Sequence, residues 1–306
     1  MGSISPRPGS IADNRDAILG ALKDQYAVEG EMTLRRCWYV LLSKQLVHEH
    51  PDPKSQSQRN APYRRLSQLL LNARISGGLP WEVIVDRTRR LDKPLTWGDV
   101  DEAVNYILET FRYDPMGEQE RYVEVWVEKD AVSTRIYQTA KQFFVPVITA
   151  RGFSSGTYLH NGAERLNQIP RERQITVIYL SDFDPEGEYF PQLFKDQIGK
   201  RYGCARSVEI EKLALTRKQI DTLGLPWIPL IAQASHLLKS YVSRYVGDNS
   251  KRKVELDALD NVTLASLLRT RLGDLVDTRA IADSQSKSKM AVKDWRARYG
   301  FLEGPS

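Results

Sequence analysis

The sequence predicts an α/β protein in which a helical N-terminal part precedes a parallel β-sheet with helices on both faces. Three observations support this prediction. Short apolar runs alternate with amphipathic stretches between residues 120 and 215, as in βαβ units. Residues 13–76 instead carry apolar side chains at helical spacing. Finally, a chain of 306 residues that is 41% hydrophobic can bury two cores.

Residues 1–16 are polar and lack the apolar segment of a secretion signal, so we expect residues 1–12 to form a disordered leader. No apolar run reaches the roughly 18 residues that span a bilayer. Cys37 and Cys204 are the only cysteines, and their spacing fits neither a disulfide framework nor a zinc site. These features indicate a cytoplasmic protein without a membrane partner.

The N-terminal part is predicted to begin with helices over residues 13–28, 33–48 and 61–76. Gly77 and Gly78 provide the stop signal for the third helix. A short strand at 79–89 and a helix at about 97–111 follow. Several short helices beside a β-like segment are typical of a winged-helix or helix-turn-helix module, which we assign to residues 13–115.

The charge distribution supports a nucleic-acid partner for this module. Residues 33–90 contain eleven basic and four acidic residues, a local balance of +7, whereas the whole chain carries +5. The remainder therefore sums to −2. A basic segment beside a carboxylate-bearing remainder suggests that one part binds a polyanion and the other a cation. A solvated basic helix face is the alternative interpretation.

From residue 120 onward the pattern predicts a Rossmann-like domain that ends near residue 260. Strands are expected at 122–127, 145–150, 175–180 and 207–215, with helices between them. Thr216 and Gln219 form a capping box for a further helix. Residues 261–306 are expected to be a helical extension in which 283–290 ("DSQSKSKM") are flexible, and the tryptophans Trp81, Trp97 and Trp227 are expected in the core.

Acidic residues follow two of the predicted strands. Glu128 comes directly after the first strand, and Asp182 and Asp184 follow the third. Strands that neighbour each other in a sheet lie about 5 Å apart, so these carboxylates can meet although fifty residues separate them. Oxygen ligands without His or Cys specify Mg²⁺, or Mn²⁺, rather than zinc. An acidic turn at Asp184-Pro185 is the structural alternative.

These motifs resemble the Toprim domain of topoisomerases, primases and some nucleases. "VEKDA" (127–131) and "SDFDPEG" (181–187) are most similar to the A subunit of type IIB topoisomerases, topoisomerase VI, and its meiotic relatives. "LALT" (213–216) and "VELDAL" (254–259) extend the resemblance. It implies a Toprim domain over 120–260, with Glu128, Asp182 and Asp184 as the metal ligands.

The same resemblance implies a nucleophilic tyrosine in the N-terminal module. The family pattern R-x-x-Y-Y aligns Arg35 with its assisting arginine and Tyr39 with its nucleophile, while Trp38 replaces the first tyrosine. Helical geometry places Arg35 and Tyr39 one turn apart on a flank that we expect to face outward. A guanidinium there is expected to lower the pKa of the phenol. A tyrosine with a purely structural role is the alternative.

The implied activity is Mg²⁺-dependent cleavage of double-stranded DNA through a phosphotyrosyl intermediate. The resemblance also implies a homodimer in which the tyrosine of one copy meets the metal of the other. The sequence has no P-loop, so strand passage would need an ATPase partner of the B type. The alternatives are a hydrolytic Toprim nuclease, for instance one that acts in defence, and a DNA-binding protein with a vestigial site.

Further candidates complete the predicted site. Three residues are expected to hold the metal ligands in place or to contact phosphate: Lys129, Arg151 and Glu186. Contacts to the DNA backbone are Arg36, Arg64, Arg65, Arg74, Arg87 and Arg89.

Overall fold

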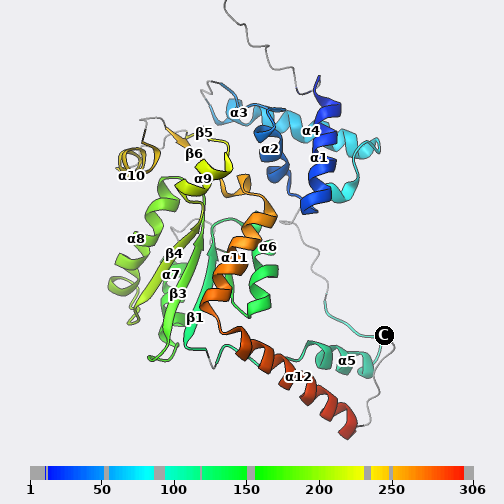
Figure 1. Cartoon of the computed structure of the whole chain (residues 1–306), viewed down its shortest axis with the longest axis vertical. Helices are drawn as coiled ribbons and strands as arrows, with labels where there is room; N and C mark the ends of the chain where they lie inside the picture. Colours follow the sequence, from blue (N-terminus) through cyan, green and yellow to red (C-terminus); the bar gives the residue numbers. More distant parts are fainter. Residues whose placement is uncertain are drawn as a thin grey trace, which may run out of the picture.

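The structure is a computed structural model that describes residues 11, 13–51, 55–85, 94–117, 119–149, 156–230, 236–247 and 251–299. It is an α/β fold. A central sheet separates a group of N-terminal helices at one end from a pair of helices at the other (Figure 1). The expected leader, residues 1–12, lies outside the described residues except for Ile11.

The N-terminal helices are α1 (Arg15–Glu29), α2 (Leu34–Ser43), α3 (Gln56–Arg59) and α4 (Ala61–Ile75). The three longer ones confirm the predicted helices, although α2 is shorter than expected. It stops because Gln45 adopts a left-handed conformation, with φ of 58°, and Leu46 N–H donates to Leu41 O at 2.9 Å. This is the Schellman arrangement that ends many helices.

A winged-helix module stays a prediction. The described part of residues 13–85 contains no β-strand, only an isolated bridge between Met32 and Ile84. The strand expected at 79–89 is a 3₁₀ turn over Trp81–Val83 in its described portion. The helix expected near 97–111 is α5 (Val100–Thr110).

The central sheet is parallel and has the order β2-β1-β3-β4. Its strands are β1 (Arg121–Val127), β2 (Val147–Thr149), β3 (Gln174–Leu180) and β4 (Val208–Ala214), which confirms the four predicted strands. β1 and β3 pair along their full length, from Arg121 with Gln174 to Val127 with Leu180. Both are almost entirely buried, as expected for strands that are covered on both faces.

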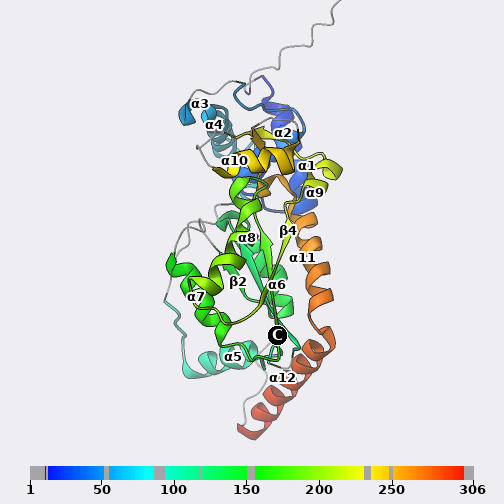
Figure 2. The same ribbon diagram turned by 90° about the vertical axis from the view of Figure 1, so that its left-hand side faces the viewer.

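Helices cover the two faces of this sheet. α6 (Asp130–Ala140) and α11 (Asn261–Leu275) pack on one face, and α7 (Gly156–Asn167) and α8 (Pro185–Lys200) pack on the other (Figures 1 and 2). Consecutive residues of β3 alternate between these cores: Ile178 joins the first, and Tyr179 joins the second. The predicted capping box starts α9 (Arg217–Leu223), where Thr216 N–H donates to Gln219 Oε1 at 2.9 Å.

A short segment after α9 returns to the carboxyl edge of the sheet. β5 (Ile228–Pro229) pairs with β6 (Arg252–Lys253), with α10 (His236–Tyr241) and a π-helical turn (Val242–Val246) between them. The 3₁₀ turn η4 (Leu256–Ala258) follows β6. Val254 forms a two-way backbone bridge with Phe183, so β6 and η4 lie against the loop that leaves β3.

The C-terminal helix α12 (Thr278–Tyr299) corrects one expectation. Residues 283–290 were expected to be flexible but form the middle of this helix. Ser284 Oγ donates to Tyr113 O at 3.1 Å, and Ser288 Oγ accepts from Tyr113 N–H at 3.0 Å. The two serines are buried and anchor the residues after α5, a role that composition alone does not reveal.

Two of the three tryptophans assigned to the core are also exposed. Trp81 is 53% exposed under the Arg74 guanidinium, and Trp97 is 38% exposed beside Tyr106. Trp227 is half-buried and packs against the first core.

Candidate active site

The candidate site lies at the carboxyl edge of the sheet, between β1 and β3. The chain leaves β1 toward β2 on one side and reaches β3 and β4 on the other, so the strand order reverses at this point. Such a switch point is where open α/β sheets bind ligands. Glu128 follows β1, and its backbone N–H donates to Leu180 O at 3.0 Å. Asp182 and Asp184 follow β3. The three predicted carboxylates therefore come from adjacent strand ends.

Glu128 has an incompletely satisfied carboxylate. Its Oε2 atom is buried and has no hydrogen-bond partner among the described residues. Burial raises the pKa of Glu128 to about 7, and the negative charges of Asp182 and Asp184 add to the rise. Lys129 and the backbone N–H of Asp182 act in the opposite direction. These effects show that the three carboxylates share one electrostatic environment.

Asp184 and Gly187 explain the local shape of "SDFDPEG". Asp184 is the N-cap of α8, and its Oδ1 atom accepts from Gly187 N–H at 2.8 Å. Pro185 occupies the first turn, where its missing N–H costs nothing. A Cβ atom on Gly187 would lie 2.3 Å from Asp182 O, so only glycine fits this close turn.

Asp182 is held from several sides and is 3% exposed. Its Oδ1 atom accepts from Leu256 N–H at 2.8 Å and lies 3.0 Å from Lys129 Nζ. Lys129 also pairs with Glu255 at 3.1 Å and Asp257 at 3.2 Å. We predicted that Lys129 supports the metal ligands or contacts phosphate; in the structure it pairs with Asp182, Glu255 and Asp257 and so joins the two acidic segments of the site.

A second ammonium group lies beside the predicted metal ligands. Lys253 Nζ is 3.8 Å from Asp182 Oδ2, 3.9 Å from Asp184 Oδ2 and 3.2 Å from Glu255 Oε1. Sequence reasoning did not identify Lys253, Glu255 or Asp257 as site residues. The only signal was the motif "VELDAL", which was noticed for its resemblance and not for its carboxylates.

Arg35 and Tyr39 meet as helical spacing predicts, with Arg35 Nη2 3.4 Å from the Tyr39 hydroxyl. Their surroundings differ from the expected outward flank. Tyr39 is 1% exposed, because α2 packs against η4. Arg35 Nη2 lies 2.5 Å from Glu255 Oε2, within the same chain. Thus Tyr39 lies beside acidic residues of its own chain, whereas the resemblance implied that it would meet the metal site of a second copy.

The pKa of Tyr39 also moves opposite to expectation. Burial raises it well above its usual value, Glu255 adds to the rise, and Arg35 only partly opposes it. Glu255 itself is stabilised as an anion. Burial alone would raise its pKa, but Lys129, Lys253 and Arg35 outweigh burial and hold the pKa well below its usual range.

The remaining predicted residues are dispersed. Arg36 is buried, donates to Glu29 Oε1 and to Ala258 O at 2.9 Å each, and has no surface available for a DNA contact. Arg64 and Arg65 are exposed on α4, and Arg74 is half-buried and reaches Ile84 O. Glu186 is exposed on the first turn of α8. Arg87, Arg89 and Arg151 lie outside the described residues.

A polar cavity of about 300 Å³ lies beside the Tyr39–Arg35 pair. Its lining combines cations, carboxylates and two aromatic rings: Arg35, Trp38, Glu49, Arg59, Asn60, Tyr63, Lys253 and Glu255. Three of the eight residues carry positive charge, and Arg35 lies over the Tyr63 ring at 5.3 Å. The lining includes Lys253 and Glu255, two residues of the candidate site.

The donor set fits Mg²⁺ or Mn²⁺ in its chemistry. Glu128, Asp182 and Asp184 offer oxygen atoms, and Glu128 Oε2 has an unused acceptor. In their present arrangement, however, no three acidic, His or Cys side chains in the described part of the chain already surround a common metal position. Lys253 neutralises the two aspartates instead, so a divalent cation would compete with its ammonium group.

Comparisons of the chain with protein-family models, with curated proteins and with solved structures find no match. The class of the protein therefore rests on the motifs and on the geometry described above. Within the described residues, no helix combines the length and apolar content needed to cross a bilayer.

Proposed function

We propose that the protein is a Mg²⁺-dependent enzyme that cleaves double-stranded DNA by tyrosine transesterification, similar to the A subunit of topoisomerase VI. One observation carries the proposal: the Tyr39–Arg35 pair and the carboxylates Asp182 and Glu255 meet at the switch point of a parallel sheet. A phenol, a guanidinium and clustered acids are the groups that such a phosphoryl transfer requires. We also propose a cytoplasmic location.

Tyr39 is the proposed nucleophile. Its oxygen forms a bond to phosphorus, the bond to one sugar oxygen breaks, and the products are a phosphotyrosyl link and a free hydroxyl end. Arg35 would exchange its ion pair with Glu255 for one with the phosphate, since a guanidinium binds carboxylate and phosphate in the same planar manner. Mg²⁺ held by Glu128, Asp182 and Asp184 would supply charge that stabilises the developing anion.

The burial of Tyr39 limits access of DNA to its hydroxyl group. A duplex phosphate cannot reach a hydroxyl that is 1% exposed. Under this proposal the arrangement is a closed, resting one, and DNA would have to separate α2 from η4 before attack. An ATPase partner or a second copy of the chain would be suitable agents for this opening.

The same burial favours a second candidate, a hydrolytic Toprim nuclease in which water attacks and Tyr39 is structural. Its raised pKa and the hydrogen bond that it accepts from Arg35 are those of a structural tyrosine. A DNA-binding protein with an inactive site is the third reading.

Tyr39→Phe distinguishes these readings, and Tyr137→Phe, on an exposed tyrosine of α6, is the matched control. Supercoiled plasmid is incubated with each protein and Mg²⁺ or Mn²⁺, then denatured and examined for cleavage and for DNA-linked protein. We expect wild type and Tyr137→Phe to cleave and to form the adduct, and Tyr39→Phe to do neither. Cleavage by Tyr39→Phe would establish the hydrolase. Plasmid binding by wild type without cleavage under any metal would favour the inactive site.

A further inference from the structure

Lys253 lies between the acidic residues of the candidate site and the polar cavity beside them. Its Nζ atom is 3.8 Å from Asp182 Oδ2, 3.9 Å from Asp184 Oδ2 and 3.2 Å from Glu255 Oε1. The same residue lines the cavity of about 300 Å³. A lysine ammonium is a point charge on a flexible stem. Rotation of this stem can therefore move one positive charge from the acidic residues to the cavity.

The two sides of Lys253 carry opposite formal charge. On the acidic side of the described chain, the cations Lys129, Lys253 and Arg35 face five carboxylates, so the formal charge is −2: Glu128, Asp182, Asp184, Glu255 and Asp257. The cavity is lined by three cations and two carboxylates, and its formal charge is +1. Arg35, Lys253 and Glu255 belong to both counts, because they form the boundary between the two sides.

Arg59 is a further cation of the cavity. Within the described part of the chain its guanidinium forms no ion pair and no hydrogen bond, in contrast to Arg35, which is bound to Glu255. Glu49 lies nearby: burial raises the pKa of this carboxyl, and Arg59 is the charge that opposes the rise most. A guanidinium that is not bound to a carboxylate remains available to a phosphate group, which it binds well.

The N-terminus of α4 lies at the same cavity. Asn60 is the N-cap residue and lines the cavity, and its side chain does not cap the helix. The first turn of α4 contains no acidic residue. The N-terminal end of a helix of 15 residues is a region of positive potential that favours anions. This helix end and the side chains of Arg59 and Lys253 therefore favour the same kind of ligand.

We infer that the polar cavity binds a phosphate group and that Lys253 links this binding to the binding of a divalent cation by the predicted metal ligands. A phosphate group beside Arg59 attracts the ammonium group of Lys253 into the cavity. Asp182 and Asp184 then lose a monovalent counter-charge, and a divalent cation replaces it. A phosphate dianion and a divalent cation add no net charge when they bind together, whereas either ligand alone adds two charges to the site.

This inference rests on the proposed metal ligands, but it requires neither attack by Tyr39 nor cleavage of DNA. Binding linkage makes the effect reciprocal, because each ligand must raise the affinity for the other by the same factor. Such couplings are typically about 5- to 150-fold. The phosphate group can belong to a free ion or to a nucleic-acid strand, and two different probes distinguish these sources.

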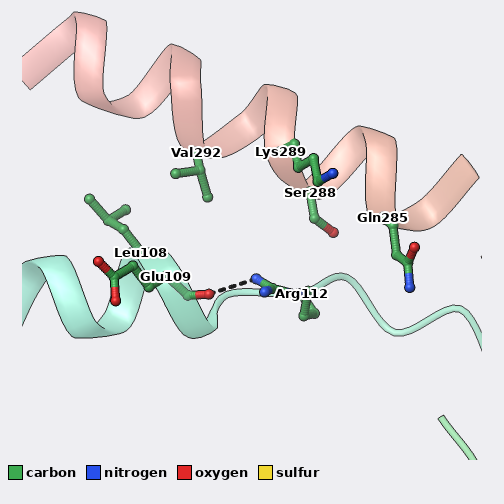
Figure 3. A pocket seen from close by; sticks show the side chains of 7 residues that line it. All are labelled: Leu108, Glu109, Arg112, Gln285, Ser288, Lys289 and Val292. Carbon is green, nitrogen blue, oxygen red and sulfur yellow. Dashed lines mark hydrogen bonds between the residues drawn. The ribbon is translucent and has the colours of Figure 1, made fainter. Parts of the chain in front are cut away.

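Binding of Mn²⁺ to the full chain tests the inference, with free Mn²⁺ measured by its electron paramagnetic resonance signal. Each protein is titrated in chloride, in inorganic phosphate and in a thymidine dinucleotide, whose phosphate is a diester, all at one ionic strength. The variants are Lys253→Met and Arg59→Met; the second leaves the cations beside the carboxylates in place and so remains informative if the first does not fold. Lys289→Met is the matched control, because it removes the same charge beside another cavity, of about 450 Å³, between α5 and α12 (Figure 3).

We expect phosphate to raise the Mn²⁺ affinity of wild type and of Lys289→Met roughly tenfold. Arg59→Met should bind Mn²⁺ as wild type does in chloride but lose the effect of phosphate. Lys253→Met should bind Mn²⁺ about fivefold more tightly than wild type in chloride, because no ammonium group competes, and phosphate should change this affinity little. A response to the dinucleotide would assign the cavity to a strand phosphate, and a response to the inorganic ion alone would assign it to a free phosphate; both results support the inference.

A wild-type Mn²⁺ affinity that neither phosphate nor the dinucleotide changes overturns the inference, as does an equal increase in Arg59→Met. Absence of Mn²⁺ binding in all four proteins overturns it as well, since Lys253 is then not what limits the metal. The outcome for the proposed function is separate. Phosphate-linked Mn²⁺ binding together with DNA cleavage by Tyr39→Phe would support this inference and reject the transesterase.

Discussion

Glu128 carries a carboxylate that burial and two neighbouring acids keep partly protonated near neutral pH. Its pKa of about 7 lies above the ordinary value of 4.5, so the folded protein holds a proton that the unfolded chain has already released. A raised acid pKa therefore stabilises the fold below pH 4.5, and this contribution is lost as the pH rises through 7.

Glu128→Gln should remove this part of the pH dependence. Between pH 5 and 8 we expect wild type to lose on the order of 3 kcal/mol of unfolding free energy relative to the variant, as 1.36 kcal/mol for each pKa unit implies. Urea unfolding in the presence of a chelator, at several pH values, measures the difference. Parallel profiles for the two proteins would show that Glu128 is ionised in the fold at pH 5.

Tyr39 shows where residue-level prediction stops. Helical periodicity correctly placed Arg35 and Tyr39 together, because spacing along one helix is a local property. It could not show that η4 covers them, since that contact joins residues 220 positions apart. The direction of the pKa shift was wrong for the same reason: burial outweighs the guanidinium.

At the level of elements, the strands and their order of appearance were predictable from the sequence. β1 and β3 are short runs rich in apolar and β-branched residues, as buried parallel strands are, and this predicted that Glu128, Asp182 and Asp184 would share an edge. β6 has only two residues, and its place at the site depends on a bridge between Phe183 and Val254. A two-residue strand shows no alternation of apolar and polar side chains in the sequence. For this reason Lys253 and Glu255 were not predicted as site residues.

The turn between β3 and α8 tolerates no side chain at Gly187. In Gly187→Ala, the Cβ atom would lie 2.3 Å from Asp182 O and 2.7 Å from Ser181 Oγ. We expect a loss of about 1–3 kcal/mol or more, the usual cost of overpacking. Gly20→Ala in α1, where a Cβ atom would meet nothing within 4 Å, should instead stabilise by up to about 1 kcal/mol. Urea unfolding of both variants compares them, and equal stabilities would contradict the crowded turn.

For the whole molecule, a buried ion pair between α1 and α2 connects the N-terminal helices to η4 and to the start of α11. Glu29 Oε1 accepts from Arg36 Nε at 2.9 Å, and Glu29 Oε2 accepts from Asn261 N–H at 3.0 Å. Arg36 reaches Ala258 O as well. These bonds, with the Arg35–Glu255 pair, hold α2 against η4 and keep Tyr39 enclosed.

Glu29→Ala should loosen this joint. Leaving Arg36 buried without its partner is expected to cost about 3–5 kcal/mol, whereas Asp16→Ala, which removes the exposed Arg15–Asp16 pair, should change little. Thermal unfolding gives the stabilities, and hydrogen exchange at α2 reports the enclosure of Tyr39. Unchanged exchange at α2 in Glu29→Ala would place the main connection elsewhere.

The long sequence separation within this joint has a consequence for synthesis. Arg36 bonds to a residue 222 positions later, so a ribosome has completed α2 well before it makes the segment that encloses it. At about 5–20 residues per second, that interval is on the order of ten to forty seconds. During translation Tyr39 is therefore made well before Glu255 and the η4 segment that cover it. The chain encloses Tyr39 only after the segment around Ala258 has been made.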